Sequence, residues 1–201
     1  MINGIFSLLK FALFVVLIPV VVTVTAAFTD SLKGLPGGLE HNFLWGAAAF
    51  LVVHLFIVEI AAVHRFGQKL VGDVFRFWTP LSEAAPLLVP VFAFLTLLFF
   101  VVTDLIWSVK DLGRYFMFFT GFFLAMHFVF TARGLREGEK GGNLANYYFY
   151  LCLIYIVNLL LLALVFDGMF PGFSFPDMVE RINAESLQIY GLIFKQLFVP
   201  R

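Results

Sequence analysis

The segment from Phe43 to Val63 constrains this chain most, because it is apolar and long enough to cross a bilayer yet contains His54 and Glu59. A charged side chain at the centre of a bilayer costs at least about 2.5 kcal/mol. We therefore expect both side chains to face protein or water rather than lipid. The segment predicts a membrane helix whose polar side interacts with other helices.

The composition of the whole chain supports a membrane protein. Of its residues 62% are hydrophobic and 13% are charged, whereas a soluble domain has about 25% charged residues. The 13 Lys and Arg residues are balanced by 13 Asp and Glu residues, so the basic excess of a nucleic-acid-binding protein is absent. The single cysteine, Cys152, excludes an intramolecular disulfide and a cysteine metal cluster.

Uninterrupted apolar runs predict an all-α integral membrane protein with five transmembrane helices. We expect the spans at about residues 11–28, 43–63, 85–109, 115–132 and 147–166. The first run is longer than the core of a signal peptide, so we interpret it as an uncleaved span. Residues 1–167 then form the membrane domain, and residues 168–201 form a C-terminal tail.

Two further segments are amphipathic. Between His64 and Ala84, apolar residues recur at helical spacing beside basic ones, which is typical of a helix that lies flat at the lipid headgroups. The apolar residues are Phe66, Leu70, Val74, Phe77 and Trp78, and the basic ones are Arg65, Lys69 and Arg76. A last helix from about Asp177 to Phe198 is too charged in its first half to span, so we expect it to lie on the membrane or on a partner.

The distribution of basic residues predicts the orientation. With the N-terminus in the cytoplasm, most Lys and Arg residues outside the spans fall on the cytoplasmic side, as the positive-inside rule requires. The predicted location is the cytoplasmic (inner) membrane, with the tail extracytoplasmic. Aromatic residues typical of membrane interfaces lie at the proposed span ends: Trp45, Trp78, Trp107, Tyr115, Tyr147 and Tyr148.

This topology places intramembrane polar residues in two layers. Glu59 and His127 lie equally far before the basic residues that close their spans, so each falls about 9 Å from the inner boundary. His54 and Asn158 both fall about 16 Å deep on the same scale. If the spans are adjacent, the four side chains form either a proton or ion relay or a hydrogen-bonded cluster that only fixes packing.

Other chemistries have weaker support. His54, His64 and His127 can be interpreted as ligands of a b-type haem held between spans. Asp104 can be interpreted as an ion-binding carboxylate, although its place beside Trp107 favours a solvated surface position. The zinc-protease HExxH, serine-hydrolase GxSxG and nucleotide-binding Walker motifs are all missing, so we expect neither a metal site nor an enzyme.

We therefore predict a small, non-enzymatic membrane subunit of a larger complex, in transport or envelope biogenesis. Its partners would be the lipid bilayer and other membrane subunits or a second copy of the chain. The first alternative is an oligomeric ion- or proton-coupled transporter or channel that uses Glu59 and His127. The second alternative is a haem-bearing membrane anchor of a respiratory complex.

Overall fold

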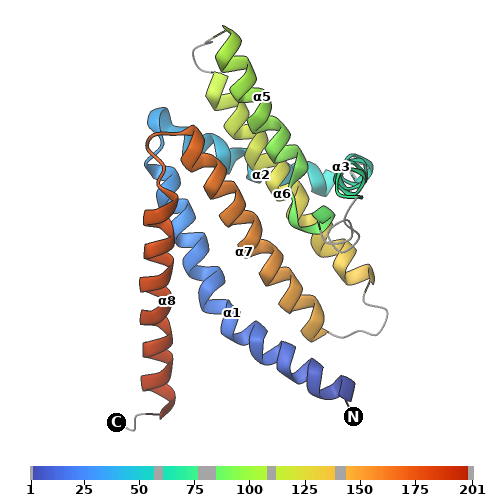
Figure 1. Ribbon diagram of the computed structural model, residues 1–201, viewed down its shortest axis with the longest axis vertical. Coiled ribbons are helices and arrows are strands. Elements are labelled where there is room, and N and C mark those ends of the chain that lie inside the picture. Colours follow the sequence, from blue (N-terminus) through green and yellow to red (C-terminus); the bar gives the residue numbers. More distant parts are fainter. Residues whose placement is uncertain (1, 57–60, 77–84, 108–111, 139–143, 199–201) are drawn as a thin grey trace. The chain divides into compact units, whose positions relative to one another are not determined.

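The computed structural model describes residues 2–56, 61–76, 85–107, 112–138 and 144–198. These residues form helices and no strand, which confirms the all-α prediction (Figure 1). The elements are α1 (Ile2–Lys33), the short 3-10 helix η1 (Pro36–Gly38), α2 (Leu39–Phe56), α3 (Ala61–Val74), α5 (Val91–Trp107), α6 (Leu112–Gly138), α7 (Leu144–Met169) and α8 (Phe175–Phe198).

Four of these helices are long and apolar enough to cross a membrane: α1, α2 (counted together with η1), α6 and α7. The third predicted span, residues 85–109, corresponds to α5, which is apolar but has only 17 residues. At about 1.5 Å per residue that length is slightly below the thickness of a bilayer core. Helix α5 begins directly after Pro90, whose ring fixes its own φ and lacks an N–H donor.

The chain divides into two compact units. Unit 1 comprises Met1–Gly34 and Glu139–Arg201, and therefore holds α1, α7 and α8. Unit 2 comprises Leu35–Gly138, and holds η1, α2, α3, α5 and α6. Each unit has its own buried core.

Helices α1 and α7 of unit 1 run in the same direction. Their contacts advance together along both helices, from the stacked rings of Phe14 and Tyr148 (5.3 Å between centroids) to those of Phe28 and Phe166 (6.1 Å). Phe166 is fully buried. Packing of large aromatic rings therefore accounts for much of this interface.

Helix α8 packs along α1 and runs in the opposite direction (Figure 1). Three hydrogen bonds join the two helices: Arg181 to Asp30 (3.3 Å), Thr23 with Ser186 (2.8 Å), and the Tyr190 hydroxyl to the Val16 carbonyl. Their α1 members are spaced by seven residues, which a helix places on one face. The α8 helix was expected from the sequence, and its alignment along α1 was not.

Unit 2 depends on a close crossing of α2 and α6. A Cβ atom on Gly46 would lie 1.8 Å from the Phe118 carbonyl oxygen, and one on Gly121 would lie 2.0 Å from the Phe43 carbonyl oxygen. Each glycine therefore lets the backbone of the other helix approach. Further contacts advance together from Phe50 against Phe122 to His54 against Phe130, so α2 and α6 run in the same direction, as predicted.

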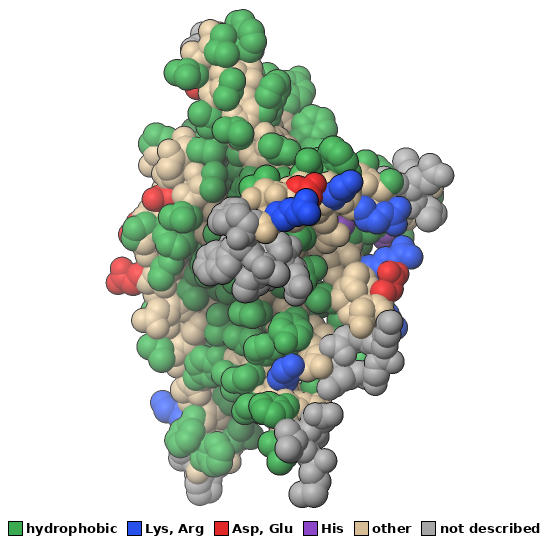
Figure 2. All heavy atoms as spheres, turned by 45° about the vertical axis from the view of Figure 1, so that its right-hand side comes forward, with side chains coloured by type: hydrophobic (Ala, Val, Ile, Leu, Met, Phe, Trp, Pro, Cys, Tyr) green, Lys and Arg blue, Asp and Glu red, His purple; other side chains and the backbone are tan. Residues whose placement is uncertain are grey.

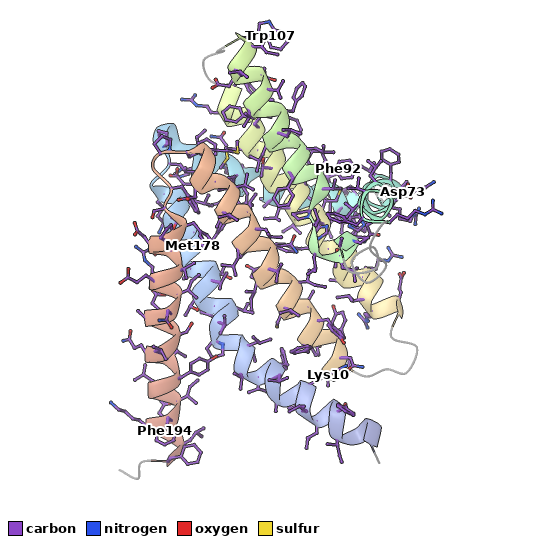
Figure 3. The ribbon with its side chains drawn as sticks, viewed as in Figure 1. Lys10, Asp73, Phe92, Trp107, Met178 and Phe194 are labelled. Carbon is purple, nitrogen blue, oxygen red and sulfur yellow. The ribbon has the colours of Figure 1, made fainter. Side chains whose placement is uncertain are left out.

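Helix α3 lies across α5 and α6, and is seen end-on in Figure 1. Its packed face holds His64, Gly67 and Val71, and a Cβ on Gly67 would lie 2.4 Å from the Phe92 ring, which projects from α5 toward α3 (Figure 3). The predicted apolar row Phe66, Leu70 and Val74 is 59%, 38% and 66% exposed. Phe77 and Trp78 lie outside the described residues.

The predicted second span, residues 43–63, is wrong at its end. Residues 61–63 belong to α3, whose axis lies across α5 and α6 rather than continuing α2. The close packing of α3 on α5 needs Gly67, because a Cβ there would lie 2.4 Å from the Phe92 ring. Similarly, the predicted fourth span at residues 115–132 continues as helix to Gly138.

The substitution Gly46→Ala tests the α2–α6 crossing. The added methyl group has no space, so we expect the helices to separate and the stability of unit 2 to fall by about 1–3 kcal/mol or more. Gly138→Ala is the control, because nothing lies within 4 Å of a Cβ there. Thermal unfolding in detergent measures both variants, and equal stability of the two would contradict the crossing.

Cysteine cross-linking tests the position of α8. In a Cys152→Ser background, the pair Thr23→Cys and Ser186→Cys should form a disulfide on oxidation, because the native hydroxyls are 2.8 Å apart. Loss of maleimide labelling reports the bond. The control pair Thr23→Cys and Leu187→Cys should stay labelled, because Leu187 is 63% exposed on another face of α8. Labelling of both pairs would place α8 away from α1.

Candidate functional site

Histidines from α2, α3 and α6 gather around one phenylalanine in unit 2. The ring centroids of His54 and His64 each lie 5.4 Å from that of Phe130. The ring of His127 lies 5.6 Å from that of His64. The cluster forms because α2 runs beside α6 and the chain changes direction before α3.

The spacing of His54 and His64 differs from the prediction. On one straight helix these residues would lie about 15 Å apart. Because both rings contact Phe130 instead, they are closer than that. His64, which the sequence analysis treated as a secondary candidate, is therefore the central histidine of the cluster.

The hydrogen bonds of these histidines are incomplete. His127 is 4% exposed, and its Nε2 lies 3.1 Å from the Leu87 carbonyl oxygen, so this nitrogen is the protonated one. His64 is 5% exposed, yet its Nε2 has no partner among the described residues, and the same holds for Nδ1 of His54. Buried polar atoms almost always have a partner, so an unpaired ring nitrogen marks a place for a water, a proton or a ligand.

Burial also sets the charge of His64. Removal of the imidazole from water disfavours its charged form and lowers the pKa of His64 to about 4. The side chain is therefore neutral at pH 7. In this state it can donate or accept one more hydrogen bond without bringing a second positive charge next to Arg65.

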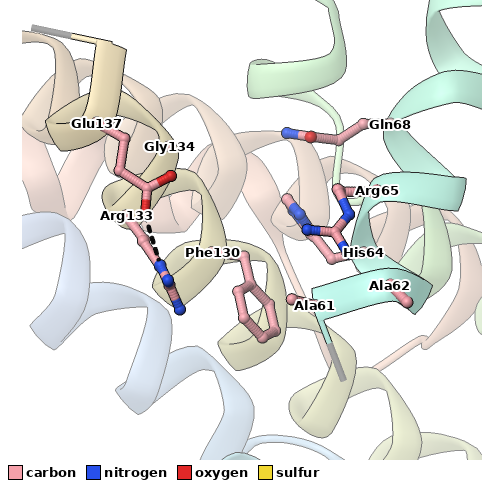
Figure 4. Close-up of a pocket in the computed structure, with 9 residues that line it drawn as sticks. All are labelled: Ala61, Ala62, His64, Arg65, Gln68, Phe130, Arg133, Gly134 and Glu137. Atoms are coloured by element: carbon pink, nitrogen blue, oxygen red, sulfur yellow. Dashed lines mark hydrogen bonds and ion pairs between the residues drawn. The ribbon is translucent and has the colours of Figure 1, made fainter. Parts of the chain in front are cut away.

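A cavity of about 640 Å³ opens beside His64, between α3 and the last turns of α6 (Figure 4). Its lining residues are Ala61, Ala62, His64, Arg65 and Gln68 from α3, and Phe130, Arg133, Gly134 and Glu137 from α6. Basic side chains gather on the side of the surface where α3 lies (Figure 2). The cavity is therefore polar at its mouth and aromatic at its base.

The charges that line the cavity leave one positive charge unbalanced. Arg133 donates to Glu137 at 2.7 Å, and both side chains are more than half exposed, which shows that the cavity opens outward. Arg65 forms no hydrogen bond or ion pair with any other residue in the part of the chain described. With His64 neutral, Arg65 gives the lining its net charge.

A second, much smaller space is lined by both His64 and His127. His64 and Gln68 line both spaces, and the smaller one is closed on its other sides mainly by Phe92, Phe123 and Met126. Its volume is about 10 Å³, which is near the smallest space that holds one water.

Of the predicted relay residues, the described part of unit 2 contains His54 and His127. Glu59 lies outside the described residues, so its pairing with His127 stays a prediction. Asn158 belongs to unit 1, where it is fully buried and donates to the Ile154 carbonyl of its own helix at 2.8 Å, while its Oδ1 has no partner in the described chain. Asp104 is exposed near the end of α5 and does not line the cavity.

Gln68, Arg133 and Glu137 were not predicted as site residues. The last two lie beyond the predicted end of the fourth span at residue 132, although their four-residue spacing is the spacing that pairs opposite charges on a helix. That spacing was the signal for a helix that continues beyond residue 132.

Metal and haem binding were also considered. In the described residues, no group of at least three His, Cys, Asp and Glu side chains is placed to hold a metal ion. The b-type haem hypothesis stays a prediction. In this structure the Nε2 atom of His127, the usual axial nitrogen, is bonded to the Leu87 carbonyl.

No protein-family model, no curated protein and no solved structure matches this chain. The cavity and the histidine cluster are therefore the features that bear on its function.

Proposed function

We propose that this protein is an integral membrane protein that binds an anionic group in the His64 cavity and takes up a proton on binding. The observation that carries the proposal is a cavity lined by His64, whose buried Nε2 has no partner among the described residues, and by Arg65, whose charge no described lining residue balances. A phosphate or carboxylate group would pair with Arg65 and accept a hydrogen bond from His64 once its Nε2 is protonated. A cation would be repelled by Arg65.

Arginine is well suited to the anion-binding role. Its guanidinium presents several N–H donors in a planar fork and stays charged at all physiological pH values. Gln68 adds an amide from the next turn of α3, and Arg133 lies across the cavity on α6. These donors approach the space from two helices.

Proton uptake follows from the charge of the ligand. A negative charge near His64 favours its protonated form, and so opposes the lowering of its pKa by burial. Two protonated imidazoles 5.6 Å apart repel each other, so the pair His64 and His127 accepts one proton rather than two. The relay predicted from the sequence is thereby proposed at His64, with His127 behind it.

The membrane location is part of this proposal. Large apolar side chains such as Leu55, Phe56 and Leu105 are about 80% exposed, which a soluble surface does not favour. We propose that α5 crosses the membrane as well, which gives five spans. We also propose that the protein lies in the cytoplasmic (inner) membrane with its N-terminus in the cytoplasm.

A second candidate function is that of a subunit of a larger membrane assembly. It is favoured because long helices make up nearly all of the described chain and leave few described residues for a soluble domain. Co-purification of defined partners in mild detergent would support it. Transport of an anion by the isolated protein in liposomes would contradict it and support the transporter alternative.

Anion affinity should depend on pH through His64. The pKa of His64 is about 4 in the free protein and higher in the complex, so binding takes up a proton between these two values. Affinity should therefore rise as the pH falls from 7 toward 4, and level off below 4. Calorimetric titration with glycerophosphoglycerol, a phosphodiester whose charge is constant over this range, measures the effect.

The control for this experiment is His64→Asn, which keeps a hydrogen-bonding side chain but cannot take up the proton. Its affinity should be nearly independent of pH. The other charged or titratable groups near His64 are Arg65, His54, His127, Arg133 and Glu137. An unchanged pH dependence in the variant would assign the proton to one of those groups.

Glu137→Gln should strengthen anion binding. The substitution removes the carboxylate that neutralises Arg133, and so raises the net positive charge of the lining. Because the pair is exposed, we expect a gain of less than about 1 kcal/mol, or up to fivefold in affinity at low salt. The gain should shrink as salt is added. Weaker binding in this variant would mean that Glu137 contacts the ligand.

A further inference from the structure

We infer that the ligand of the His64 cavity is the phosphodiester headgroup of a monoanionic membrane lipid. This inference rests on the proposed function and names the class of ligand. Three observations carry it: the cavity is lined by an amphipathic helix, its lining has a net positive charge, and the same unit exposes large apolar side chains.

Helix α3 has the three faces of a helix at a membrane interface. The face with His64, Gly67 and Val71 packs against the protein. The apolar row of Phe66, Leu70 and Val74 is exposed and makes no core. Arg65 and Lys69 are exposed beside it, as expected of a helix whose apolar side enters the acyl chains while its basic side stays among the headgroups. The cavity, which α3 lines, therefore opens at headgroup level.

The charge of the lining selects a monoanion. Glu137 neutralises Arg133, His64 is neutral in the free protein, and Arg65 remains as the single unbalanced charge. A phosphodiester with an uncharged headgroup carries one negative charge and balances this lining as it stands before His64 takes up a proton. A zwitterionic headgroup also carries an ammonium group. The only carboxylate among the described lining residues, Glu137, already pairs with Arg133 and does not offer that ammonium group a partner.

The surroundings of the cavity suit an amphiphile. Its volume of about 640 Å³ accommodates a headgroup, and Gln68 can bond to headgroup hydroxyls. At the end of α2, Leu55 and Phe56 are 79% and 81% exposed, and Val63 of α3 is 45% exposed. These side chains give the acyl chains an apolar surface in the same unit as the cavity. A soluble anion would make no use of that surface.

Native mass spectrometry of the full chain tests the inference. The protein is released from nanodiscs of phosphatidylcholine that contain a minor fraction of phosphatidylglycerol or, separately, phosphatidylethanolamine. We expect retention of phosphatidylglycerol, and about tenfold weaker retention in Arg65→Gln, since a charge-assisted hydrogen bond is lost. Lys69→Gln is the matched control, because it removes the same charge from α3 at an exposed position that does not line the cavity.

Every other result of the lipid experiment would contradict one part of the inference. Equal loss of lipid in both variants would mean general attraction to α3 rather than a site. Equal retention of phosphatidylethanolamine would overturn the monoanion assignment. Arg65-dependent binding of soluble glycerophosphoglycerol without lipid retention would overturn the lipid inference and leave the proposed function intact. If neither lipid nor soluble headgroup binds in an Arg65-dependent way, the proposed function fails as well.

Discussion

The close approach of α2 and α6 is the contact on which the rest of unit 2 depends. Gly46 and Gly121 each face a carbonyl oxygen of the opposite helix, so the two backbones touch without side chains between them. Contacts of this kind allow weak Cα–H···O bonds and extensive van der Waals packing, which bind helices together where lipid gives no hydrophobic drive. At this separation, Phe50 and Phe130 share one core, and His54 reaches Phe130.

The sequence predicted the helices well and their directions only in part. Long apolar runs and the basic amphipathic segment identified α1, α2, α6, α7 and α3, because burial periodicity is a local property. The end of α2 was missed because its apolar pattern continues without Pro or Gly into α3. The change of direction depends on packing between distant residues, such as Gly67 with Phe92, and no local pattern records it.

At the candidate site too, local sequence patterns predicted some features, and packing between distant residues decided the others. Counting residues along a span estimates only the depth of a polar residue. It gives no rotation about the helix axis, and it fails where a helix turns, which is why His64 was underrated. Arg133 was assigned to a loop because a charged, Gly-rich sequence follows it, although the Arg133–Glu137 pair lies on continuous helix.

Whether anion binding moves a proton at neutral pH depends on how well the cavity excludes water. Raising the pKa of His64 from about 4 to near 7 requires about 4 kcal/mol. A negative charge about 4 Å away supplies about 1 kcal/mol in bulk water and about 4 kcal/mol at the effective dielectric constant of a protein surface. A small soluble anion that leaves the cavity wet therefore couples weakly. A lipid headgroup whose chains cover Phe56 and Val63 displaces that water, and so makes the histidine pair sensitive to the ligand.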